Sequence, residues 1–71
     1  MNYALQILQS SLNDELKAKA DADDYIEGIR GVESYYQKDT IEAFKESRRL
    51  AIERIPQLRD AIARINASDH P

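Results

Sequence analysis

The sequence contains no cysteine and a single histidine, His70, next to the last residue. A disulfide and a thiolate metal site are therefore excluded, and one imidazole does not make a metal cluster. We expect neither a metal site nor a cofactor. A chain of 71 residues buries only about 60% of the surface that it exposes when unfolded, so a single core is marginal. Association with another chain is the remaining means of stabilisation.

Glycine and proline are also scarce, with two of each. The residues that dominate instead, such as Ala, Leu, Ile, Glu and Arg, favour long helices, so we predict one all-α domain over residues 1–71. No apolar run approaches the ~20 residues of a membrane span, and no basic segment followed by an apolar block marks a secretory signal. We therefore expect a cytoplasmic protein that does not contact a membrane.

The net charge of −3 is unevenly distributed. Residues 1–36 hold seven acids and three bases, whereas residues 37–71 hold six acids and seven bases. Opposite signs favour packing of the two halves against each other. The net negative charge disfavours general nucleic-acid binding, because that affinity comes mostly from neutralised phosphates.

A seam of eight residues, seven of them apolar, runs through the second half of the chain in alternating steps of three and four, the spacing typical of a coiled coil. The seam residues are Ile41, Phe44, Arg48, Ala51, Ile55, Leu58, Ile62 and Ile65. The pattern predicts a helix over about residues 40–66. Pro56 lies within it and lacks the N–H that would bond to Ile52, so we expect a kinked helix, with a break at Ile55 as the alternative.

The boundaries of this second helix also have local signals. Asp39 followed by Glu42 has the spacing of a capping box, which places a short turn at residues 37–39. Residues 67–71 are expected to form a polar tail.

The first half of the chain carries two apolar stripes. Asn2 can cap a helix that begins at Tyr3, and a leucine stripe follows it. A second stripe, from Ala18 to Tyr36, is rotated by roughly a third of a turn from the first. We favour one helix over about residues 3–36, because no Gly, Pro, Asn or Ser occurs between Glu15 and Asp24. The alternative is a break near Asp21, which would give a three-helix bundle.

Folding the chain at Lys38 gives an antiparallel two-helix hairpin that resembles a coiled coil. Residues whose numbers add up to about 76 or 77 would then lie side by side. Tyr25 is expected opposite Ala51, Val32 opposite Phe44, and Tyr36 in the core against Ile41. This pairing uses the whole second stripe and the whole seam.

The hairpin leaves part of the leucine stripe without a partner. Two helices have one mutual interface and cannot cover so wide an apolar surface. We therefore predict self-association into a helical bundle, most simply a homodimer with four helices, through Leu5, Leu8, Leu12 and Leu16.

Several charged and aromatic residues are candidates for contact with a partner or with phosphate. They are Arg48, Arg49, Arg54, Arg59 and Tyr35. The arginines spread around the helix among acidic residues, which favours a salt-bridged surface over a phosphate site. Arg48 differs because it lies in the seam opposite Gly28, where a charged residue commonly specifies register or partner. The acidic middle of the first helix could also imitate nucleic acid.

Catalysis has no support in the sequence. It contains no recognisable nucleophile with a base and too little chain to form a cleft. We expect a non-catalytic protein that binds another macromolecule, most simply a protein, as an adaptor, inhibitor or regulator. A small regulator that binds nucleic acid or a nucleotide through the arginines is the alternative.

Overall fold

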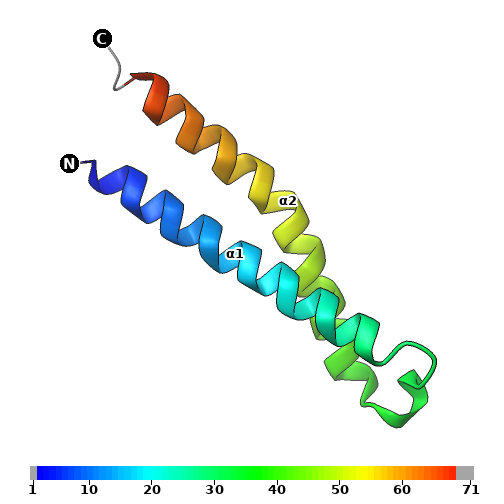
Figure 1. Cartoon of the computed structure of the whole chain (residues 1–71). Coiled ribbons are helices and arrows are strands. Elements are labelled where there is room, and N and C mark those ends of the chain that lie inside the picture. Colours follow the sequence, from blue (N-terminus) through cyan, green and yellow to red (C-terminus); the bar gives the residue numbers. More distant parts are fainter. Residues whose placement is uncertain (1, 69–71) are drawn as a thin grey trace.

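The computed structural model describes residues 2–68, which form two long helices packed as an antiparallel hairpin (Figure 1). Helix α1 spans Tyr3–Gly28 and helix α2 spans Lys38–Ser68, and a short 3₁₀ turn, η1 (Glu33–Tyr35), lies between them. This described range contains no β-strand. The hairpin is elongated, with principal extents of 56 × 16 × 16 Å. The predicted all-α hairpin is confirmed.

Helix α1 begins where the sequence predicts. Oδ1 of Asn2 accepts the N–H of Leu5 at 3.1 Å, which satisfies one of the amides that a first turn leaves without a partner. The helix then continues through Asp21, whose carboxylate pairs with Lys17 one turn earlier at 2.8 Å. The alternative of a break near Asp21, with three helices in a bundle, is therefore wrong.

Helix α1 ends at Gly28 rather than near Tyr36. Gly31 adopts a φ of 87°, a left-handed conformation that ends helical geometry and that glycine takes at little cost. Its N–H donates to Oε2 of Glu33 at 3.0 Å, which closes the turn. The connection therefore covers residues 29–37 instead of the predicted 37–39.

Helix α2 begins at Lys38, so Asp39 lies inside the first turn and the predicted capping box is wrong. A carboxylate in the first turn still interacts favourably with the helix dipole. Pro56 lies inside α2, which continues to Ser68, so the alternative of a break at Ile55 is also wrong. Figure 1 shows that α2 changes direction along its length. Residues 67 and 68, predicted as tail, are helical, and residues 69–71 lie outside the described range.

The core is thin and lies along the line where the two helices meet. Its buried residues are Ala22, Ile29, Ile41, Ala51 and Ile55. Ala22 and Ala51, one on each helix, are completely inaccessible to solvent. Small side chains at these positions let the two backbones approach closely. Four larger seam residues are only half-buried: Phe44, Leu58, Ile62 and Ile65.

Three side-chain contacts between the helices define the register of the hairpin. The ring centroids of Tyr25 and Phe44 lie 4.1 Å apart, and the shortest N–O distances of two ion pairs are 3.7 Å for Arg48–Asp23 and 3.3 Å for Arg54–Glu15. The residue numbers of each pair add up to between 69 and 71, instead of the predicted 76 or 77. The hairpin is thus shifted by about one heptad from the expected pairing.

This shift leaves the seam positions inside the hairpin and changes their partners. Tyr25, predicted opposite Ala51, stacks on Phe44. Tyr36, predicted as core, is 45% exposed and meets the ring of Tyr25 edge-on, with centroids 6.1 Å apart. The partners differ from the predicted ones because the connection is longer than expected, which moves the centre of the turn toward the N-terminus by about half a heptad.

Candidate interaction surface

The predicted oligomer interface, Leu5, Leu8, Leu12 and Leu16, does not form one exposed surface. The first three leucines are half-buried, and Leu16 is 37% exposed. The register places this stripe opposite the C-terminal half of α2, where Leu58, Ile62 and Ile65 are also half-buried. The second helix of the same chain therefore covers part of the stripe, and Leu16 is its most exposed member. Its role in oligomerisation stays a prediction.

One side of the hairpin combines exposed apolar residues with charges. Residues four, three and four positions apart lie on the same side of a helix. This side, called the Leu16–Ile52 face below, consists of Leu12, Leu16, Lys19, Asp23, Arg48, Ile52, Ile55 and Arg59. The Asp23–Arg48 ion pair and the antiparallel direction arrange the face in four layers: Asp23 with Arg48, Lys19 with Ile52, Leu16 with Ile55, and Leu12 with Arg59.

The centre of the Leu16–Ile52 face is apolar and open to solvent. Leu16 is 37% exposed and Ile52 is 51% exposed, while Ile55 between them is buried. The Lys19 side chain is half-buried, so its aliphatic part can cover apolar surface while its ammonium group reaches Asp23. An exposed apolar centre with a charged edge is the composition of a protein contact site.

A small ion cluster lies at the turn-proximal edge of this face. Nζ of Lys19 donates to Oδ2 of Asp23 at 2.8 Å, and Nη1 of Arg48 lies 3.7 Å from Oδ1. The hydrogen bond from Lys19, assisted by the charge of Arg48, lowers the pKa of the Asp23 carboxyl below its usual value. Arg48, predicted opposite Gly28, thus pairs with Asp23, as the shifted register requires.

The other arginines of α2 differ in their partners. Arg49 pairs with Glu46 and Glu53 of its own helix, which lowers the pKa of Glu46 and raises that of Arg49. Arg64 pairs with Asp60 at 3.0 Å, and Arg54 pairs with Glu15 across the hairpin. Arg59 has no carboxylate within ion-pair distance in residues 2–68. Most of the predicted phosphate contacts are therefore already neutralised.

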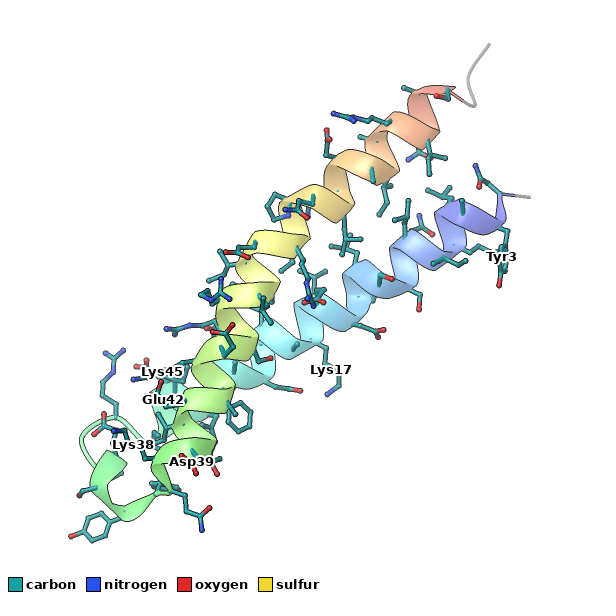
Figure 2. All side chains as sticks on the ribbon, turned by 180° about the vertical axis from the view of Figure 1, so that it is seen from behind. Tyr3, Lys17, Lys38, Asp39, Glu42 and Lys45 are labelled. Carbon is teal, nitrogen blue, oxygen red and sulfur yellow. The ribbon has the colours of Figure 1, made fainter. Side chains whose placement is uncertain are left out.

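The turn end of the hairpin carries the most exposed aromatic residue. Tyr35, in η1, is 86% exposed, so its ring is accessible to a partner. Figure 2 shows Lys38, Asp39, Glu42 and Lys45 at this end of α2. A shallow depression there is lined by Glu33, Ser34, Tyr36, Lys38, Ile41, Glu42 and Lys45. Its lining mixes both charge signs and has no buried polar side chain.

Residues 2–68 contain no buried polar or charged side chain and no group of three or more ligands placed to hold a metal ion. Neither helix in this range is long and apolar enough to cross a membrane. No family model, curated protein or solved structure matches the chain. A proposal about function must therefore rest on the exposed residues of the hairpin.

Sequence reasoning identified Arg48 as a seam residue but missed its partner, Asp23, and the layered Leu16–Ile52 face. The signal was present in the sequence, because Leu12, Leu16, Lys19 and Asp23 repeat at four, three and four positions. It was missed because Asp23 lies in the acidic middle of the first helix, which we considered as an imitation of nucleic acid. Only the shifted register brings these residues level with Arg48 and Ile52.

Proposed function

We propose that this chain is a non-catalytic helical protein that self-associates and binds another protein, as an adaptor, inhibitor or regulator. The supporting observation is an excess of exposed surface. The chain exposes 5428 Å², whereas a compact monomer of 8.1 kDa exposes about 4,500 Å². Its radius of gyration is 16.1 Å, against about 11 Å for a compact domain of this length. A cytoplasmic location stays part of the proposal.

The composition of the excess surface supports a protein partner. Leu16 and Ile52 expose their side chains beside each other on one side of the hairpin, and Lys19, Asp23 and Arg48 border them. An interface needs an apolar centre that is shielded by a polar edge. The Leu16–Ile52 face has this arrangement.

The ion pairs of α2 favour a protein over a nucleic acid. Affinity for nucleic acid comes mostly from unpaired cationic side chains that displace the counterions condensed on the phosphate backbone. Arg49, Arg54 and Arg64 already have carboxylate partners, and acidic residues lie between them along the helix. The nucleic-acid alternative therefore has weaker support.

A matched pair of variants tests the proposal. Ile52→Glu places a carboxylate at the centre of the Leu16–Ile52 face. Ile7→Glu places one at a residue of nearly equal exposure, 49%, which by helix spacing lies on the opposite side of α1 from Leu16. Sedimentation should show that Ile52→Glu loses self-association, and pull-downs should show that it also loses protein that binds the associated form, while Ile7→Glu retains both. Binding to RNA or DNA that weakens steeply with salt and survives Ile52→Glu would instead support the nucleic-acid alternative.

A further inference from the structure

We infer that two copies of this chain associate in parallel through their Leu16–Ile52 faces, so that Asp23 and Arg48 of both copies form one ring of four alternating charges. This inference rests on the self-association part of the proposed function and specifies its geometry. The product is a four-helix bundle in which every neighbouring pair of helices is antiparallel.

The surface area fits a dimer of this kind. The 5428 Å² exposed by the chain exceeds the area of a compact monomer by about 900 Å². A standard interface buries about 800 Å² on each partner. Burial of one additional face per chain therefore accounts for the excess exposed area. A second copy offers a face of matching length because it is the same elongated hairpin.

The order of the layers selects the parallel arrangement. A twofold axis along the hairpin places α1 of each copy against α2 of the other and brings each layer onto the same layer of the second copy. Leu16 of each copy then lies over the buried Ile55 of the other copy, which gives an apolar layer. Asp23 meets Arg48 of the second copy, and Arg48 meets its Asp23.

The opposite arrangement is disfavoured by charge. A twofold axis across the hairpin places α1 against α1 and reverses the order of the layers. Arg59 would then face Arg48 of the second copy, and Leu12 would face its Asp23. Like charges and a carboxylate against leucine both oppose association. Arg59 has no carboxylate partner of its own in residues 2–68 that would offset this repulsion.

The Asp23–Arg48 pair has capacity for a second partner. Its shortest N–O distance is 3.7 Å, longer than a hydrogen bond, and the two side chains are 41% and 38% exposed. Lys19 occupies only Oδ2 of Asp23, at 2.8 Å. Oδ1 can therefore accept a guanidinium from the second copy. A charged layer beside an apolar one adds little affinity to an interface but specifies its register and orientation.

Two single charge reversals, studied apart and mixed, test the ring. In the Asp23→Arg variant all four residues of the ring are positive, and in the Arg48→Asp variant all four are negative. Each variant alone should therefore dimerise at least about tenfold more weakly than the unchanged protein. A mixture of the two should form heterodimers that are at least about tenfold tighter than either homodimer. Native mass spectrometry with one isotope-labelled variant reports all three species, and circular dichroism checks that each variant is helical.

Glu15→Arg and Arg54→Glu provide the matched control. They reverse the other ion pair between α1 and α2, at 3.3 Å, and Arg54 lies about 120° around α2 from Arg48. Their mixture should show no preference for heterodimers. Asp23→Asn and Arg48→Gln, which avoid repulsion within the chain, should each weaken dimerisation if a charge-reversed variant fails to fold.

These experiments distinguish the charge ring from self-association itself. A dimer that is insensitive to both Asp23 and Arg48 variants, or a preference for heterodimers in the Glu15 and Arg54 mixture, would overturn the ring while leaving self-association in place. An unchanged protein that sediments as a folded monomer at high concentration would overturn both.

Discussion

Tyr25 of α1 stacks on Phe44 of α2, with ring centroids 4.1 Å apart and planes inclined by 17°. This contact joins the last part of α1 to the first part of α2, next to the connection. The edge of Tyr36 completes the cluster at 6.1 Å. Because aromatic pairs contribute about 0.5–1.5 kcal/mol beyond their buried area, the cluster both stabilises the turn end and specifies which residues face each other.

Phe44→Ala should therefore destabilise the protein by about 2–4 kcal/mol, through loss of packing and of the ring contact. Tyr35→Ala, at an exposed aromatic residue of η1, should cost less than about 0.5 kcal/mol. Urea unfolding followed by circular dichroism measures both. Equal effects would show that the stack does not contribute to stability.

Replacing each of the two glycines with alanine should change the stability of the protein in opposite directions. Neither position has an atom within 4 Å of an added Cβ, so sterics with neighbours do not decide the outcome. Gly31→Ala should destabilise by about 1–2 kcal/mol because φ is 87° there. Gly28→Ala, at the helical end of α1, should stabilise by about 0.5–1 kcal/mol. Thermal unfolding of the two variants provides the comparison.

Leu8→Asp and Ile52→Glu should separate folding from association. Leu8 is half-buried on the side of α1 that α2 covers, so an unpaired carboxylate there should reduce helix content at every concentration. Ile52 is 51% exposed, and its variant should keep its helix content while losing association. Circular dichroism and light scattering over a concentration series distinguish the two effects. Loss of helicity in Ile52→Glu at all concentrations would mean that the hairpin and the interface are inseparable.

Acid should weaken the ion cluster of the Leu16–Ile52 face. The Asp23 carboxyl has a lowered pKa in the folded state, chiefly because of its hydrogen bond from Lys19. Its contribution to stability is therefore fully present above the unfolded value of about 3.9 and is lost as the pH falls through the lower folded value. Carbon NMR titration should show this low pKa directly.

The Lys19→Met variant tests the cause of that shift. Removing the ammonium donor should raise the pKa of Asp23 toward its usual value, whereas Lys38→Met, at the start of α2, should leave it unchanged. An unaltered Asp23 titration in Lys19→Met would assign the shift to Arg48 instead.

The sequence predicted the helices better than their pairing. The Asn2 cap, the seam of α2 and the continuity of α2 through Pro56 all follow from local spacing and chemistry. The register did not, because a displacement by one heptad leaves every seam residue inside the hairpin. The end of α1 depended on the left-handed φ of Gly31, which the sequence allows but does not require.

The same limits apply to the candidate surface. The seam pattern identified Arg48, but the prediction that it lies opposite Gly28 depended on the register and was therefore wrong. Leu5, Leu8 and Leu12 were assigned to an oligomer interface because the expected register left the stripe without enough cover. In the observed hairpin they lie opposite the C-terminal half of α2 and are half-buried.

The heptad repeat of the seam also bears on how the chain folds. A hairpin closed one heptad out of register would bury nearly the same apolar positions, so hydrophobic burial alone separates the two states poorly. The competing state would lack the Tyr25–Phe44 stack and the ion pairs of Asp23 and Glu15 with α2. These few contacts, together with the turn at Gly31, therefore also select the observed register over the competing one, and the variants that remove them should refold through slow phases that the unchanged protein lacks.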